Sequence, residues 1–248
     1  MEKKETFASL MQSFGYRHDL RSFFDDFLTL VISALARNYK TGKSEDEELY
    51  LSIIGKYEKE IQDKFPKLFG LLVLEMDERI ATGQNPDVLG EFYEQNLSRK
   101  GASQYFTPWN ACQLMTEMTM QTDWEKMLKS SPLRVLDPCC GSGRMLLAGV
   151  AKSKRKNEYY GIDIDLTCVK MTAINLFLNG AFNSEVMCAN SLMSDDFRVS
   201  YKVSFLPLGI YRVTEKSKSK LWRMHQNSFN KGNPENPVNP ETPQLRLF

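Results

Sequence analysis

The first hundred residues carry apolar side chains at the three- and four-residue spacing of amphipathic helices. From Arg21 to Leu97 this spacing continues without the alternation typical of strands, which predicts a helical region. Asn85 and Pro86 predict the N-cap and first turn of a helix over "DVLGEFYEQNL", and Gly83 predicts the end of the helix before it. The positions on the predicted apolar faces are Phe23, Phe27, Leu30, Val31, Ala34, Leu35, Leu49, Ile53, Tyr57 and Ile61.

From Leu133 the pattern changes to short apolar runs that alternate with helical segments. The order is "LRVLD", the loop "PCCGSG", "RMLLAGVAKSKRK", "EYYGIDID", "LTCVKMTAINLFLNG" and "SEVMCAN". This βαβαβ succession predicts an α/β domain with a parallel sheet and helices on its faces. Beyond Glu215 the chain is polar and rich in proline, which predicts a flexible tail. We therefore expect a helical domain at 1–100, an α/β domain at 101–213 and a tail at 214–248.

Composition narrows the possible functions. The chain is 42% hydrophobic and 25% charged with a formal net charge of +1, which is typical of a globular protein with no overall attraction to nucleic acid. The longest apolar run, "LFGLLVLEM", is too short to span a bilayer, and the first residues lack the apolar core of a signal peptide, so we expect a cytoplasmic protein without membrane contact. Five cysteines without paired spacing and only two histidines argue against disulfides, a zinc site or a histidine-based hydrolase.

The loop "PCCGSG" predicts a ligand site. Gly141 and Gly143 let a ligand approach the backbone closely, and the helix that follows offers free N–H groups at its start. A simple tight turn is the alternative interpretation. Asp163 lies 20 residues beyond Gly143 at the predicted end of the next strand, where a carboxylate can accept the two hydroxyl hydrogens of a ribose. The alternative for an acid here is a helix cap, a role that Asp165 fits better.

The end of the third predicted strand adds Asn190, which can pair with an adenine edge or form an ordinary Asn turn. All these positions lie at carboxyl ends of strands, where open α/β sheets bind ligands. The nucleoside ligand is NAD or S-adenosylmethionine. Leu146 stands where the dinucleotide motif needs its third glycine, which disfavours NAD.

The segment "DPCCGSGRML" resembles the S-adenosylmethionine loop of amino-group DNA methyltransferases, the class that includes the N6-adenine enzymes. The upstream segment "DVLGEFYEQNLSRKGASQYFTPWNACQLM" resembles the modification (M) subunits of type I restriction-modification systems. This resemblance covers about residues 87–197 and implies a class I methyltransferase fold, which is Rossmann-like, behind the helical domain. It also implies that Asp137, Gly141 and Gly143 form the cofactor loop, that Asp163 binds the ribose, and that Asn190 lies by the cofactor adenine. By the same resemblance, an aromatic-Thr-Pro segment closes over the methionine end of the cofactor; the matching residues are Tyr105, Phe106, Thr107 and Pro108, of which Thr107 and Pro108 also suit a helix start.

One family motif has no match. N6-adenine methyltransferases carry Asn-Pro-Pro-Phe or Asn-Pro-Pro-Tyr after the fourth strand, where acceptors hold the adenine amino hydrogens and an aromatic ring clamps the base. The segment expected to supply it here reads Leu206, Pro207, Leu208, Gly209, so no catalytic residue is assigned. A catalytically silent, DNA-associated binding module is therefore the alternative to an active methyltransferase. A third option is methylation of RNA or of a protein side-chain amide.

Two further features concern partners. The stretch Arg198 to Lys231 is strongly basic, which predicts either phosphate contact with DNA or a solvated tail. Sequence reading by members of this family depends on an added domain or a separate specificity subunit. The final residues "QLRLF" resemble the peptide by which bacterial proteins bind the replication sliding clamp, with Gln244, Leu245, Leu247 and Phe248 as the matching positions; chance similarity, or a tail that folds back on its own domain, is the alternative.

Overall fold

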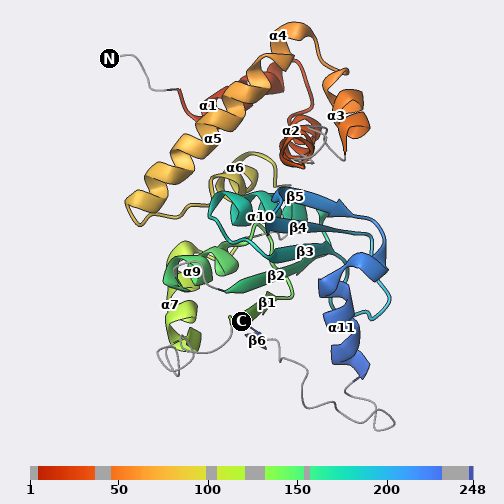
Figure 1. Ribbon diagram of the computed structural model, residues 1–248. Helices are drawn as coiled ribbons and strands as arrows, with labels where there is room; N and C mark the ends of the chain where they lie inside the picture. The colour runs from red at the N-terminus through yellow and green to blue at the C-terminus, as the bar shows by residue number, and fades with distance from the viewer. Residues whose placement is uncertain are drawn as a thin grey trace. The chain divides into compact units, whose positions relative to one another are not determined.

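The computed structural model describes residues 5–36, 46–98, 105–120, 132–153, 157–230 and 246–247 (Figure 1). The chain divides into two compact units, Met1–Phe106 and Thr107–Phe248. No helix in these described ranges is long and apolar enough to cross a membrane.

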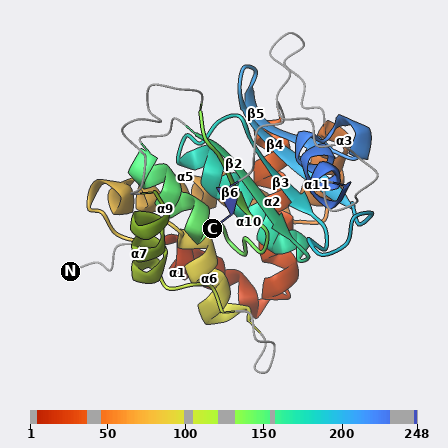
Figure 2. The same ribbon diagram turned by 90° about the horizontal axis from the view of Figure 1, so that it is seen from below.

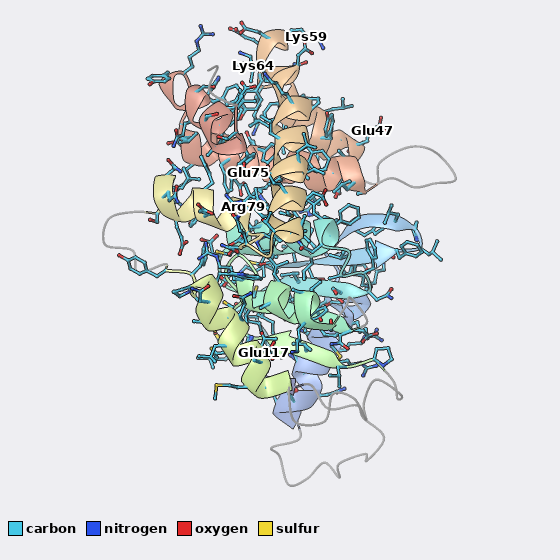
Figure 3. All side chains as sticks on the ribbon, turned by 90° about the vertical axis from the view of Figure 1, so that its left-hand side faces the viewer. Glu47, Lys59, Lys64, Glu75, Arg79 and Glu117 are labelled. Carbon is cyan, nitrogen blue, oxygen red and sulfur yellow. The ribbon has the colours of Figure 1, made fainter. Side chains whose placement is uncertain are left out.

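The first unit is helical, as the spacing of apolar residues predicts. Its core is aromatic, since Phe7, Phe24 and Phe92 are at most 2% exposed and their rings pack in contact. Along α5, Arg79 forms an ion pair with Glu75 on its own helix (both are labelled in Figure 3). It forms a second ion pair with Glu91 on α6. The elements are α1 (Phe7–Ser13), the 3₁₀ helix η1 (Phe14–Tyr16), α2 (Leu20–Leu35), α3 (Glu47–Ile54), α4 (Lys59–Gln62), α5 (Lys64–Ala81) and α6 (Val88–Asn96).

The boundaries of α5 and α6 test the capping signals. Gly83 follows the end of α5 with φ +70°, as expected of a glycine that stops a helix. The predicted N-cap at Asn85 is wrong by two residues, because α6 begins at Val88 and the Asp87 carboxylate accepts the N–H of Gly90 at 2.8 Å. A carboxylate binds these free helix N–H groups at least as well as an Asn side chain does.

The second unit contains one six-stranded sheet of order β5-β4-β3-β2-β1-β6. β1, β2, β3 and β6 run parallel, which confirms the predicted parallel βαβαβ core. β4 runs antiparallel to β3 and forms a hairpin with β5. The strands are β1 (Arg134–Asp137), β2 (Glu158–Asp163), β3 (Ser184–Cys188), β4 (Val199–Phe205), β5 (Leu208–Val213) and β6 (Arg246–Leu247), and the helices are α7 (Trp109–Met120), α9 (Arg144–Ser153), α10 (Leu166–Leu178), η2 (Lys216–Lys218) and α11 (Lys220–Asn230).

Helices cover both faces of this sheet (Figures 1 and 2), and the alternation along β2 shows how. Tyr160 and Ile162 pack in the cluster that includes Leu221 of α11. On the other face, a Cβ at Gly161 would lie 2.9 Å from Cys140 Sγ and 3.3 Å from Leu146 of α9. Alternate residues of β2 thus pack against helices on opposite faces of the sheet, which gives the three-layer arrangement of an α/β fold.

The predicted flexible tail at 214–248 is wrong for its first part. η2 and α11 follow β5, and Leu221 of α11 is fully buried. The buried carboxylate of Glu185 on β3 holds the start of α11, because it accepts the Ser219 hydroxyl at 2.6 Å and the N–H of Lys220 at 3.0 Å. Residues 231–245, which contain the proline-rich part of the predicted tail, lie outside the described residues.

Candidate cofactor site

The glycine loop lies between the end of β1 and the start of α9. Gly141 and Gly143 have φ values of +54° and +89°, where side chains are disfavoured. At Gly143 an added Cβ would also lie only 2.9 Å from Thr172 Cγ2 of α10. The loop is further fixed from α10, since Thr172 Oγ1 donates to the Gly141 carbonyl and Asn175 Nδ2 donates to the Ser142 carbonyl, each at 2.8 Å. Both glycines are therefore required by the backbone path.

Asp163 joins this loop to the neighbouring strand. Its Oδ2 accepts the N–H of Gly141 at 2.8 Å, and its Oδ1 accepts the N–H of Asp165 at 2.9 Å. Each carboxylate oxygen can accept a second hydrogen bond, so the acceptors that a ribose would use remain available. Asp165 in turn accepts the N–H of Thr167 and caps α10, which is the role expected for it.

The site concentrates partly buried carboxyl groups. Burial raises the pKa of Asp137, and the nearby charge of Asp163 raises it further, although the N–H of Cys139 opposes this by donating to Asp137. Burial also raises the pKa of Asp163, against the effect of the hydrogen bonds from Asp165 and Gly141. Burial raises the pKa of the Cys140 thiol well above its usual range. Cys140 is therefore a neutral thiol, which packs beside Gly161 of β2. A cation beside Asp137 and Asp163 would stabilise the charged forms of these two carboxyl groups.

Asn190 lies in the turn after β3. Its Oδ1 accepts the N–H of Leu192 at 3.1 Å, and its own N–H donates to Asp196 Oδ2 at 2.6 Å. This is the Asn turn that the sequence offers as an alternative to adenine pairing, so contact with adenine stays a prediction. Sequence reasoning overlooked two exposed apolar side chains that follow these strand ends: Ile164, directly after Asp163, is 58% exposed, and Leu192, two residues after Asn190, is 83% exposed.

The predicted aromatic-Thr-Pro segment is divided between the two units. Tyr105 and Phe106 belong to the first unit, where the Phe106 N–H donates to Glu94 Oε1 at 2.7 Å. Thr107 and Pro108 are exposed in the second unit, directly before α7, and the Pro108 carbonyl accepts the N–H of Cys112 at 3.0 Å. This arrangement agrees with a helix start at Thr107 and Pro108, and closure of all four residues over a cofactor stays a prediction.

Contacts between α7 and α9 place the start of α7 near the glycine loop. Trp109, the first residue of α7, packs against the cluster that Cys112 of α7 forms with Met145 and Ala148 of α9. At the other ends of the two helices, Lys152 pairs with Glu117 at 2.8 Å. The helices thus run side by side in the same direction, so Thr107 and Pro108 lie at the end of α9 that follows the glycine loop.

The segment expected to carry the catalytic motif lies far from this site. Leu206 and Pro207 form the turn of the β4–β5 hairpin, and β4 runs antiparallel to β3. Val199 pairs with Cys188 at the carboxyl end of β3, and Leu206 lies seven residues further along. At about 3.3 Å per strand residue, the turn is roughly 23 Å along β4 from the carboxyl edge of the parallel strands. The segment therefore lies at the edge of the sheet opposite to Asp137 and Asp163.

The comparisons with known proteins assign the chain to a family. A search of curated proteins finds no match. Among solved structures, the methyltransferase subunit of the type I restriction-modification system from Streptococcus thermophilus is similar, with 15% identity, a TM-score of 0.34 and coverage of 73% of this chain. The chain spans only 56% of the length of that subunit. The model of the N-6 DNA Methylase family matches residues 84–231, which is more than half of the chain. The chain therefore belongs to the N-6 DNA methylase family, as the resemblance of its glycine loop implies.

Proposed function

We propose that the unit Thr107–Phe248 binds S-adenosylmethionine at the carboxyl edge of its sheet. The hydrogen bond between Asp163 and the N–H of Gly141 carries this proposal, because it joins the glycine loop to a carboxylate at the end of the next strand. Membership of the N-6 DNA methylase family supports it independently. When bound, the cofactor would supply the methyl group of its sulfonium for transfer to the amino group of adenine in DNA.

The residues at this edge fit such a ligand. Asp137 and Asp163 have raised pKa values, so a sulfonium or ammonium cation nearby would stabilise their charged forms. Asp163 would accept the ribose hydroxyls, the loop from Gly141 to Gly143 would lie against the methionine part, and Asn190 would lie beside the adenine. Ile164 adds an exposed apolar side chain next to Asp163, which suits contact with a purine face.

Calorimetric titration with S-adenosylmethionine and S-adenosylhomocysteine tests the proposal. The intact chain should bind both, and Asp163→Ala should weaken binding by about 1 to 3 kcal/mol through the lost hydroxyl contacts. Because Asp163 also holds Gly141, an analogue without ribose hydroxyls separates the two roles. Ribose contact predicts that Asp163→Ala and the analogue together cost little more than either change alone.

Asp165→Asn is the matched control, since this residue caps α10 through the N–H of Thr167. It should retain the affinity of the unsubstituted chain. Absence of binding by the intact chain, or equal losses for the variants of Asp163 and Asp165, would contradict the assignment.

A second candidate function follows from the hairpin turn. Transfer forms an N–C bond as the S–C bond breaks, and the amino group must lose a proton, so acceptors must hold its hydrogens near the methyl group. Leu206 offers no such acceptor and lies at the opposite edge of the sheet. This observation favours a chain that binds cofactor but needs another polypeptide to methylate DNA.

A methyl-labelling assay distinguishes the two functions. The chain alone should label adenine in mixed DNA at about 100- to 1,000-fold below an active adenine methyltransferase, because one lost electrostatic contact typically costs that much. Efficient N6 labelling by the chain alone would show that the catalytic segment lies elsewhere in it. Labelling that depends on cell extract would support a partner chain.

The proposed partners are DNA, a separate specificity subunit and the bacterial sliding clamp. For the clamp, Arg246 and Leu247 pair with β1 as β6, whereas Gln244, Leu245 and Phe248 lie outside the described residues. A labelled peptide of residues 240–248 should bind the clamp saturably, and replacement of Leu247 and Phe248 by Ala should abolish binding. Equal binding of the two peptides would rule the clamp out.

A further inference from the structure

We propose that Lys202, Lys216 and Arg223 form a preorganised binding surface for the phosphate backbone of duplex DNA. These three residues are called the basic patch below. The proposal rests on the proposed function only in its choice of DNA as the polyanion. It concerns a surface separate from the glycine loop.

The charge of the chain is distributed very unevenly. Residues 198–230 hold seven of the 32 Lys and Arg residues but only one of the 31 Asp and Glu residues, which gives a formal net charge of +6. The remaining residues therefore sum to −5, although the whole chain is at +1. Such a local field attracts a polyanion even when the net charge is near zero.

Some of these cations are already neutralised. Arg198 pairs with Asp196 at 3.2 Å, Lys218 pairs with Glu215 at 2.7 Å, and Lys220 pairs with Glu158 at 3.0 Å. In the described part of the chain, no ion pair involves a residue of the basic patch. These three residues are therefore the charges that a ligand can neutralise.

The three residues of the basic patch lie around η2 and the first turn of α11, although they come from separate elements. Lys202 Nζ on β4 donates to the Lys218 carbonyl at 2.7 Å. Lys216 Nζ lies 5.2 Å from the ring centroid of Trp222. Arg223 Nε donates to the Ser219 carbonyl at 3.3 Å. These contacts leave further N–H donors on each cation for a ligand.

The segment that carries these contacts is folded, in contrast to the tail that the sequence predicts there. Leu221 is fully buried, and Glu185 binds Ser219, Lys220 and Leu221. This segment is thus ordered before a ligand binds, so binding does not carry the entropic cost of ordering a flexible basic tail. A preorganised set of lysine and arginine donors is suited to phosphate oxygens.

Arg212 supplies an internal control. It pairs with Tyr201 across the hairpin, whereas Lys202 pairs with Tyr211 in the adjacent row. Side chains of adjacent residues in a strand point to opposite faces, so Arg212 lies on the face opposite to Lys202. Arg212 is exposed and basic but does not belong to the patch.

The test measures binding of a labelled duplex by fluorescence anisotropy at several salt concentrations. The patch variant is K202Q/K216Q/R223Q in the full chain. The control variant R212Q/K59Q/K67Q removes the same charge, with Lys59 and Lys67 taken from the exposed surface of the helical unit (Lys59 is labelled in Figure 3). Loss of three phosphate contacts should reduce the slope of log K against log salt by about 2.7, while the control should keep nearly the slope of the unsubstituted chain.

Further arms make the outcome decisive. The conservative variant K202R/K216R/R223K should restore binding, and tryptophan fluorescence should show that all variants are folded. Anionic vesicles are a second probe. The proposal would be overturned by equal slopes for the patch and control variants, or by a patch variant that loses binding to the vesicles while it still binds DNA. Calorimetry with S-adenosylmethionine on the same variants should show unchanged affinity. Cofactor binding that is absent while the DNA result holds would contradict the proposed function and leave the patch standing.

Discussion

Replacement of Gly143 by alanine tests whether the glycine loop has the geometry described above. The residue has φ +89°, and a Cβ there would lie 2.9 Å from Thr172 Cγ2 and 3.1 Å from Thr172 Oγ1. The unusual φ should cost alanine about 1 to 3 kcal/mol. Displacement of the packed Thr172 side chain should add about 1 to 3 kcal/mol. We therefore expect the free energy of unfolding to fall by about 2 to 6 kcal/mol, the sum of those two ranges.

The steric part can be separated from the backbone part. Thr172→Ser removes Cγ2, the atom nearest to the added Cβ, and keeps the hydroxyl that donates to the Gly141 carbonyl. Alone, this substitution should cost about 1 kcal/mol for the lost buried methyl. In the Gly143→Ala background it should instead recover about 1 kcal/mol or more, because it relieves the contact.

Urea unfolding followed by tryptophan fluorescence measures this effect in the correct unit. All three tryptophans, Trp109, Trp124 and Trp222, belong to Thr107–Phe248. The urea midpoint should fall for Gly143→Ala at an unchanged slope of free energy against urea. Gly70→Ala is the control for a glycine whose added Cβ meets nothing within 4 Å, and because Gly70 belongs to Met1–Phe106, its effect on unfolding is followed by circular dichroism. An unchanged midpoint for Gly143→Ala, or no recovery with Thr172→Ser, would refute the loop geometry.

Three further predictions follow from the same unit. Burial raises the pKa of Asp137, so the charged form of this side chain lowers the free energy of unfolding, and this loss grows as pH rises through the folded-state pKa. Asp137→Asn should therefore raise the urea midpoint at neutral pH and change it little at acidic pH. A lower midpoint at neutral pH would contradict this. Glu185→Ala should lower the free energy of unfolding by about 1 to 3 kcal/mol for each buried donor left without an acceptor, because the Ser219 hydroxyl and the N–H groups of Lys220 and Leu221 lose theirs. A calorimetric transition at the original temperature would exclude this. If the sliding clamp binds residues 244–248, the full chain should bind it about 5- to 30-fold more weakly than the free peptide, since the pairing of β6 with β1, worth on the order of 1 to 2 kcal/mol, must break first; equal affinities would show that β6 does not compete.

The sequence predicts the features of this fold that depend on neighbouring residues. Gly83, Gly141 and Gly143 adopt the positive φ values for which glycine is suited, and Asp165 caps the helix that follows it. The strands β1 to β3 appear where short apolar runs alternate with helical segments. Each of these signals needs only a few residues of context, which is why they can be recognised without a structure.

Features that depend on distant residues are not visible in this way. α11 is polar in sequence, and its start depends on Glu185, which lies 34 residues before Ser219. The direction of β4 is likewise hidden, because alternation defines a strand but not its orientation, and Leu206-Pro207 lacks the Asn-Gly or Asp-Gly signal of a tight hairpin. The exposed Ile164 was overlooked because an isolated apolar residue after a strand carries no pattern.

The orientation of β4 has a direct chemical consequence. If the cofactor binds as proposed, groups that act on a base beside it must lie at the carboxyl edge, close to Asp137 and Asp163. On one side, β3 is followed by β4, which runs antiparallel to it and therefore places Leu206 at the opposite edge of the sheet. On the other side, the described pairing of β1 with β6 joins Val135 with Arg246 and Leu136 with Leu247. A longer strand that paired parallel to β1 would end beside the glycine loop, and amide side chains at its end would then face Asp137 and Asp163, which the β4–β5 turn does not.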